Sequence, residues 1–313
     1  MNGLIQNKCN KYSEIYELLY KKIKWKVSSG VINLIVISYM INNKEFDYKY
    51  FMEVSDYIKV KSEKYSPLRY QDRYILASLL ISRYDNPKGK FDQLLNIQNE
   101  LIKYGFKKDS KLSLNSFALL DMEDKSNKVI KSINIYSKVK NYYPSLVNIV
   151  DYTPIILLAK KREKTHKIIK NIKSIHDKLL DQGFYESDEL RFLSYILART
   201  NTWDIEGLIK KCGNILYLGR NNGFRFKTLY YPLIGLMAIG GIYNYKDIKD
   251  VREILYNLKE SKNLRWTHEY NMVVAVMIKI IDALDGHNVI KKDIGYTIEF
   301  MKFTFLTTIS MNI

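Results

Sequence analysis

The feature of this sequence that most restricts its fold is a pattern that recurs about every 40 residues. Amphipathic segments end in a Gly-Phe pair at three places, and each pair is followed by a polar residue or two and then a more apolar segment. A glycine followed by an apolar residue is typical of a helix end, because glycine adopts the left-handed conformation there and the next side chain packs back on the helix. The three pairs are Gly105-Phe106, Gly183-Phe184 and Gly223-Phe224.

The same position can be followed along the chain by its aromatic or apolar residue. The seven markers are Trp25, Tyr65, Phe106, Tyr143, Phe184, Phe224 and Leu264, with spacings of 40, 41, 37, 41, 40 and 40 residues. Near-equal units with two helical segments each predict an all-α fold of seven helical hairpins, followed by one more helix from about residue 289. The spacing leaves open an α-solenoid (HEAT-like) or a closed α/α toroid. We expect one helical-repeat domain over residues 1–313, with about fifteen helices and no strands.

The composition agrees with a globular helical protein. The chain of 313 residues is 47% hydrophobic, which excludes a disordered chain, and its 5 prolines and 14 glycines are too few for the turns of an all-β fold. Only two cysteines are present, so a reducing compartment is indicated. The N-terminal segment is polar, and no apolar run reaches the ~20 residues of a membrane span. These features predict a cytoplasmic protein without a membrane span.

The strongly basic charge, formally +17, is a reason to consider nucleic-acid binding. The basic residues are mostly lysine, with ten arginines among the 50, whereas bidentate recognition of phosphates and bases favours arginine. The densest basic cluster, residues 160–173, places its lysines on the solvent side of an amphipathic helix. We therefore interpret most of the charge as solvated surface, which disfavours nucleic acid as the partner.

Four apolar segments carry a resemblance to a known family. They are "SPLRYQDRYILASLL", "VDYTPIILLA", "ELRFLSYILA" and "LYYPLIGLMAI". They are similar to the repeated second helices of an uncharacterised bacterial family catalogued as domain of unknown function four thousand and three. The resemblance covers most of the chain, from about Tyr12 to Ile280. Because these motifs are helix-packing patterns, the resemblance implies kinship and a helical fold, and it implies no catalytic residue.

A polar residue follows each marker by seven to nine positions, near the start of the second helix. The seven residues of this polar row are Asn33, Asp72, Asn115, Asp151, Arg191, Tyr231 and Asn271. Stacked repeats would align them along the second helices, with Arg73, Tyr230 and His268 beside them. The row is either a ladder of hydrogen bonds between neighbouring repeats or the lining of a surface that binds a polar ligand.

Two prolines, Pro154 and Pro232, lie near the level of the polar row. A proline inside a helix removes a backbone donor and bends the helix, which frees a carbonyl group of the preceding turn. We expect polar side chains of the row to take up such freed carbonyl groups.

Recognisable catalytic and metal-binding motifs are missing from the sequence. There is no phosphate-binding glycine loop, no serine nucleophile elbow and no His-Glu-x-x-His pattern. His166 and His176 share one helical segment but face different ways, and no cysteine lies near His268 in the sequence. We therefore expect neither a metal site nor a cofactor.

Three functions from different classes fit these features. The first is a binding or scaffold protein that holds a protein or peptide partner, to which the 26 tyrosines are suited. The second is a metal-independent enzyme of the α/α toroid type, with a small polar substrate in a central cavity and Asp72 and Asp151 as an acid–base pair. The third is a non-specific nucleic-acid binder that uses the lysine-rich faces. We expect the first.

Overall fold

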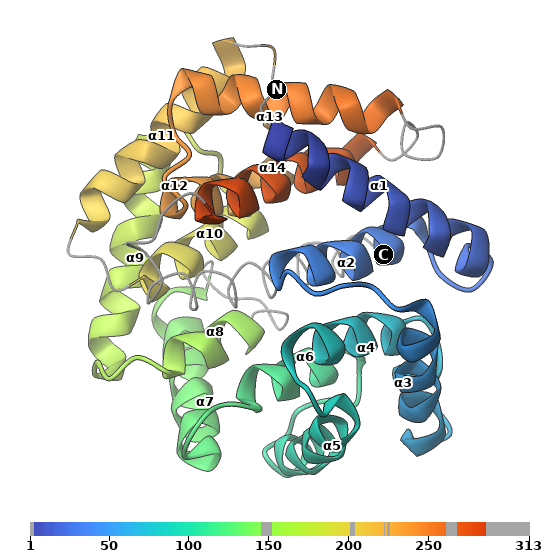
Figure 1. Cartoon of the computed structure of the whole chain (residues 1–313). Helices are drawn as coiled ribbons and strands as arrows, with labels where there is room; N and C mark the ends of the chain where they lie inside the picture. The colour runs from blue at the N-terminus through green and yellow to red at the C-terminus, as the bar shows by residue number, and fades with distance from the viewer. Residues whose placement is uncertain are drawn as a thin grey trace. The chain divides into compact units, whose positions relative to one another are not determined.

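The computed structural model describes residues 3–144, 152–200, 204–221, 223, 226–260 and 268–285. These residues form fourteen α-helices and two short 3-10 helices, with no strand among them, which confirms the all-helical expectation (Figure 1). The chain divides into two compact units. Of the described residues, those within 3–120 and 252–282 form unit 1, and those within 121–251 and 283–285 form unit 2.

Unit 1 contains three consecutive helix pairs. They are α1 (Gly3–Ile23) with α2 (Ser29–Ile41), α3 (Tyr48–Lys61) with α4 (Asp72–Arg83), and α5 (Pro87–Lys103) with α6 (Ser110–Leu119). The first helices α3 and α5 pack on each other, as do the second helices α2 and α4. First helices beside first helices and second beside second is the arrangement of a stacked helical repeat.

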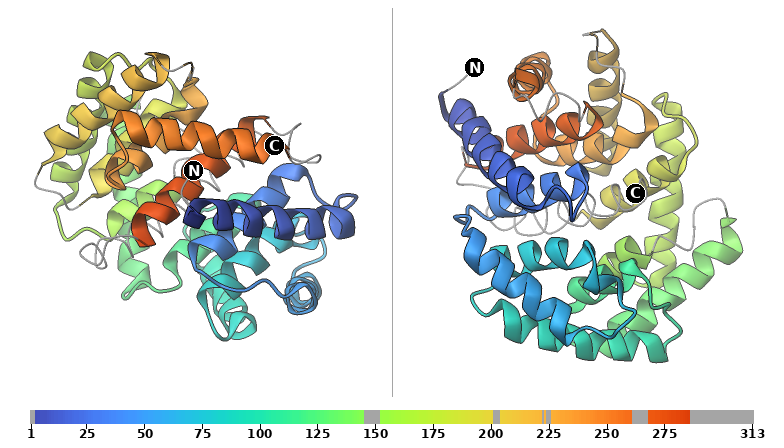
Figure 2. Two further views of the ribbon diagram at one scale, coloured as in Figure 1. Left: turned by 45° about the horizontal axis from the view of Figure 1, so that its top comes forward. Right: turned by 90° about the vertical axis from the view of Figure 1, so that its right-hand side faces the viewer.

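Unit 2 repeats this arrangement, as Figures 1 and 2 show. Its pairs are α7 (Lys125–Tyr142) with α8 (Tyr152–Ala159), α9 (Thr165–Asp181) with α10 (Asp188–Arg199), and α11 (Ile205–Asn221) with α12 (Tyr231–Ile239). The first helices pack in the order α7, α9, α11 and the second helices in the order α8, α10, α12. A further helix, α13 (Tyr245–Glu260), has residues 245–251 in unit 2 and residues 252–260 in unit 1.

The last described helix, α14 (His268–Asp285), returns to the first pair within unit 1. A methyl group added at Gly30, in the first turn of α2, would lie 2.7 Å from the hydroxyl oxygen of Tyr270. Glycine at position 30 therefore lets the tyrosine ring of α14 lie against the backbone of α2.

The two kinds of helix differ in how they are buried. In α9, for example, Ile168, Ile172 and Leu179 are buried on one face, while Lys167 and Lys170 on the other face are exposed. In α12 every residue from 231 to 238 is buried. The second helices are buried over most of their length, which explains why they carry more apolar residues than the first helices.

The glycines mark helix ends as expected. The amide of Gly105 donates to the Ile102 carbonyl at 2.9 Å, and the amide of Phe106 donates to the Leu101 carbonyl at 3.1 Å. Gly183 and Phe184 make the same pair of bonds at the end of α9. Gly105, Gly183 and Gly223 all have positive φ angles, of 90°, 84° and 75°. This geometry is the Schellman motif, in which glycine avoids the strain that a side chain would cause.

Two sequence markers and one proline behave differently from the expectation. Phe184 packs back and is buried, but the side chains of Trp25 and Tyr65 are 89% and 86% exposed. Pro232 lies in the first turn of α12, where a backbone N–H has no partner within the helix. The bend expected at Pro232 is therefore wrong, because its ring interrupts no hydrogen bond of α12.

Candidate functional site

The described members of the polar row lie in the second helices of their pairs, as the sequence predicts. The first member, Asn33, is fully buried. Asn33 in α2 accepts a hydrogen bond from the hydroxyl group of Tyr12 in α1. The Asn33 Nδ2 group and the Tyr16 hydroxyl group, one turn further along α1, have no hydrogen-bond partner among the described residues. Asn33 thus connects the two helices of the first pair through its side-chain oxygen, while its side-chain NH2 group is buried without a hydrogen-bond acceptor among the described residues.

Arg73, beside the row in α4, uses its guanidinium group inside unit 1. Its Nε donates to the Ser55 hydroxyl group of α3 at 3.2 Å, and Nη2 donates to the Tyr74 hydroxyl group at 2.6 Å. Nη1 donates to the carbonyl groups of Arg69 and Tyr70. A guanidinium group with all these partners holds α3, α4 and the turn between them together.

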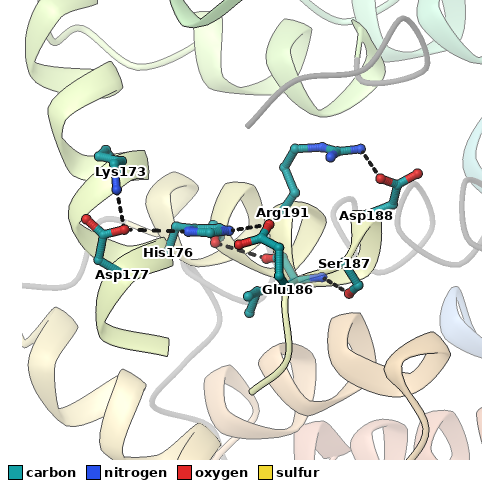
Figure 3. Close-up of polar contacts among 9 residues, drawn as sticks. Lys173, His176, Asp177, Glu186, Ser187, Asp188 and Arg191 are labelled. Carbon is teal, nitrogen blue, oxygen red and sulfur yellow. Dashed lines mark hydrogen bonds and ion pairs between the residues drawn. The ribbon is translucent and has the colours of Figure 1, made fainter. Parts of the chain in front are cut away.

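Arg191 and Tyr231 also make polar contacts in unit 2, Arg191 within its own helix and Tyr231 between repeats. Arg191 is buried in α10 and its Nη2 lies 2.7 Å from Asp188 Oδ1 (Figure 3). The Tyr231 hydroxyl group accepts a hydrogen bond from the backbone N–H of Tyr185 at 3.2 Å, and its ring meets the Phe184 ring edge-on. This contact joins one repeat to the next.

The remaining members of the row are buried or lie outside the described residues. Asn115, Tyr230 and Asn271 are all buried. Asp151 lies outside the described residues; His268 begins α14, and its side chain is outside them too. The structure therefore brings Asn33, Asp72, Arg73, Asn115 and Asn271 into unit 1 and Arg191, Tyr230 and Tyr231 into unit 2.

Asp72 differs from the rest of the row. It is the first residue of α4 and partly buried, and its carboxylate has no hydrogen-bond or ion-pair partner among the described residues. Burial without such a partner raises the pKa of Asp72 from 3.8 to about 6. A carboxylate with this pKa changes its charge near neutral pH, which is a property of acid–base and ligand-binding groups as well as of buried structural ones.

A polar cluster around His176 was missed by sequence reasoning (Figure 3). His176 is buried on α9, and its Nε2 lies 3.2 Å from Glu186 Oε1 in the turn before α10. Its Nδ1 lies 3.7 Å from Asp177 Oδ1, and Asp177 also pairs with Lys173. His166 on the same helix is exposed, as expected from its different direction. The ten-residue separation of His176 and Glu186 in sequence gave no signal of this contact, because the turn between α9 and α10 creates it.

Several exposed aromatic side chains lie at the turns inside helix pairs, whereas others, Tyr217 on α11 and Tyr245 and Tyr256 on α13, lie along helices. Trp25 follows α1, and Tyr65 and Tyr70 lie between α3 and α4. In unit 2, Tyr142 ends α7 and Tyr185 lies between α9 and α10. Large aromatic side chains left in water at such positions are the common anchors of protein–protein contacts.

The described part of the chain shows neither a metal-binding cluster nor a helix that could cross a membrane. No group of three or more His, Cys, Asp and Glu side chains there has the arrangement of a metal site. None of its helices has the combination of length and apolarity that crossing a bilayer demands. The two cysteines, Cys9 and Cys212, are buried thiols, and burial raises the pKa of both.

Comparison with known proteins gives a family and a distant relative. The model of a family described as "Protein of unknown function (DUF4003)" matches residues 15–308. The chain is 26% identical over 301 residues to "Uncharacterized protein YeaA" of Bacillus subtilis (strain 168), which covers 94% of this chain and 90% of the relative. No solved structure matches.

Proposed function

Since this chain belongs to the DUF4003 family of proteins of unknown function, we propose its function from its own surface: it is a binding protein whose helical repeats hold a protein or peptide partner. The observation that carries this proposal is the exposed aromatic side chains at the turns of both units, Trp25, Tyr65, Tyr70, Tyr142 and Tyr185. Each exposes apolar ring surface that a partner can cover, and tyrosine and tryptophan lose little side-chain entropy when they are covered.

The contacts of the polar row support the same proposal. Asn33 and Arg73 hold helices of the same pair together, and Tyr231 holds two repeats together. Side chains engaged in this way are not available to a substrate without loss of an internal hydrogen bond. The described contacts of these three residues thus support a structural role for them over the lining of a catalytic cavity.

A metal-independent enzyme acting on a small polar substrate is the second candidate, and Asp72 is the observation in its favour. Its carboxylate lacks a described partner, and burial raises its pKa to about 6, close to the value that suits a general acid or base at neutral pH. If the protein is an enzyme, the Asp72 carboxyl group contacts the substrate as a general acid or base. If it is a binding protein, Asp72 is only a partly buried residue at the start of α4.

Radical labelling of exposed tyrosine and tryptophan side chains tests the proposal. The purified protein is labelled alone and in a soluble extract of its own host, and the labelled positions are read by mass spectrometry. We expect protection of Trp25, Tyr65, Tyr70, Tyr142 or Tyr185 in the extract. Protection should disappear when the extract is first treated with protease and should persist after nuclease treatment.

Two results would contradict the proposal. Unchanged labelling of all these turns would show that no macromolecule covers them. Protection that disappears with nuclease and survives protease would assign the surface to nucleic acid instead.

A further inference from the structure

Two turns of unit 1 lie at the same end of neighbouring helix pairs. Helices α3 and α5 run side by side in the same direction: Lys88 Nζ lies 2.6 Å from Glu53 Oε1, and the Tyr57 hydroxyl group lies 2.9 Å from Asp92 Oδ2. One step further along, Lys108 Nζ lies 3.1 Å from Glu63 Oε2. Residues 61–70 and 103–109 therefore form one continuous surface, which we call the turn surface.

The turn surface exposes three tyrosine rings. The side chains of Tyr65, Tyr70 and Tyr104 are 86%, 68% and 40% exposed. These three rings lie at the same end of two adjacent repeats, so together they provide apolar contact area for a partner.

The charge of the turn surface has an excess of lysine. It holds six basic residues, Lys61, Lys64, Arg69, Lys103, Lys107 and Lys108, and two acidic ones, Glu63 and Asp109. Both acids are engaged, because Glu63 pairs with Lys108 and Asp109 accepts hydrogen bonds from the first backbone amides of α6. The ammonium groups of Lys61, Lys64, Lys103 and Lys107 have no carboxylate within ion-pair distance among the described residues. The surface is therefore complementary to an acidic partner.

The chemistry of these groups favours carboxylates over phosphates. The pair between Glu63 and Lys108 shows a carboxylate already held by a lysine of this surface. Arginine is represented on the turn surface by Arg69 alone, and its Nη1 donates to the carbonyl groups of Lys59 and Ser62, which removes the bidentate phosphate contact that uses both Nη atoms.

We propose that the turn surface binds an acidic segment of a partner protein that also carries aromatic or leucine side chains. This inference rests on the proposed binding function and adds the chemistry of the partner. Glutamates and aspartates of the segment meet Lys61, Lys64, Lys103 and Lys107, and its apolar side chains cover Tyr65, Tyr70 and Tyr104.

Fluorescence anisotropy with synthetic probes tests this inference. A labelled short peptide of glutamate and phenylalanine is titrated with the full-length protein at physiological salt. An oligothymidylate of the same length is titrated in parallel. The variant Lys64→Glu/Lys107→Glu reverses two charges of the turn surface. Its matched control, Lys246→Glu/Lys249→Glu, makes the same change of net charge at exposed positions of α13.

The peptide should bind the wild type and the control with equal affinity and the turn-surface variant about tenfold more weakly. Tyr65→Ala/Tyr70→Ala should also weaken binding while circular dichroism shows an unchanged helical content. The inference is overturned if the oligothymidylate binds more tightly than the peptide, if both charge variants weaken binding equally, or if the peptide does not bind. If the peptide does not bind but the extract still protects the turns from labelling in a protease-sensitive way, the acidic partner is rejected and the proposed binding function is retained.

Discussion

Lys8 in the first helix and Asp282 in the last described helix form an ion pair, with 3.0 Å between Lys8 Nζ and Asp282 Oδ1. The two residues are 274 positions apart in the sequence. Their side chains are only 16% and 15% exposed, so water screens the pair less than it screens a surface pair. Together with the contact of Gly30 and Tyr270, this pair fixes α14 to the first helix pair of unit 1.

Removal of one charge from this pair should destabilise the protein. Lys8→Met leaves the carboxylate of Asp282 partly buried without its partner, and we expect a loss of about 1–3 kcal/mol in the free energy of unfolding. Urea denaturation followed by circular dichroism measures the loss. The matched control is Lys88→Met, because the pair of Lys88 and Glu53 is 37% and 55% exposed. We expect that control to cost less than ~1 kcal/mol. Equal losses in the two variants would show that the pair of Lys8 and Asp282 contributes no more to the free energy of unfolding than an exposed ion pair.

A methyl group at Gly30 should destabilise the protein although alanine favours helices. In an ordinary helix interior Gly→Ala gains up to ~1 kcal/mol. Here the added carbon would lie 2.7, 2.8 and 2.9 Å from three atoms of the Tyr270 side chain, so the ring must move. We expect Gly30→Ala to cost about 1–3 kcal/mol. In a Tyr270→Ala background the same substitution should be neutral or stabilising, and a gain in stability from Gly30→Ala alone would contradict the packing of α14 on α2.

The pKa of Asp72 predicts a defined pH dependence. Because its pKa is about 6 in the folded protein and near 3.8 in the unfolded chain, the folded state binds more protons between these values. The contribution of Asp72 to stability is therefore greatest below pH 4 and is lost as the pH rises through 6. A displacement of this size is worth up to ~3 kcal/mol, which partial exposure reduces to about 1–2 kcal/mol.

Asp72→Asn removes this titration. We expect the variant to be more stable than the wild type at pH 7 by about 1–2 kcal/mol, with the difference vanishing near pH 4. Denaturation curves of both proteins across this range give the difference directly. A variant that is less stable at pH 7 would mean that the carboxylate has a favourable partner in the folded protein.

Arg191→Met tests the structural role of the polar row. The methionine keeps most of the volume of the buried side chain and removes the guanidinium that pairs with Asp188. If the row is a structural ladder, the variant should lose about 1–3 kcal/mol of stability. Thermal unfolding measures it, and an unchanged or raised Tm would keep Arg191 as a ligand-binding residue.

The helix pairs were predictable from the sequence because they depend on local chemistry. The apolar periodicity and the glycines at 105, 183 and 223 act within one or two turns of their own helices. Gly241 ends α12 with the same geometry and was missed, because an isoleucine rather than a phenylalanine follows it. Trp25 was a correct marker of position, although its exposure was not predictable from the spacing.

The partners of the polar row were not predictable in this way. Asn33 meets Tyr12, which lies 21 residues away, and Tyr231 meets the backbone of Tyr185, which lies 46 residues away. Such pairs depend on how neighbouring helices rotate and pack, and the repeat period does not specify that rotation. The turn surface was missed for the same reason, since the side-by-side packing of α3 and α5 brings residues 61–70 and 103–109 together.

Retention of a bound partner by variant proteins distinguishes a binding surface at the turns from one in the polar row. Wild type, Tyr65→Ser/Tyr142→Ser/Tyr185→Ser and Arg191→Met are each isolated from the host with the proteins they bind, and the amounts are quantified by mass spectrometry beside their Tm values. We expect the exposed-tyrosine variant to keep its Tm and lose about tenfold or more of a partner that the wild type retains. Arg191→Met should retain the partner and lose stability. The opposite pattern, with the partner kept by the tyrosine variant and lost from a fully stable Arg191→Met protein, would place the binding site in the polar row and reject a binding surface at the exposed tyrosines.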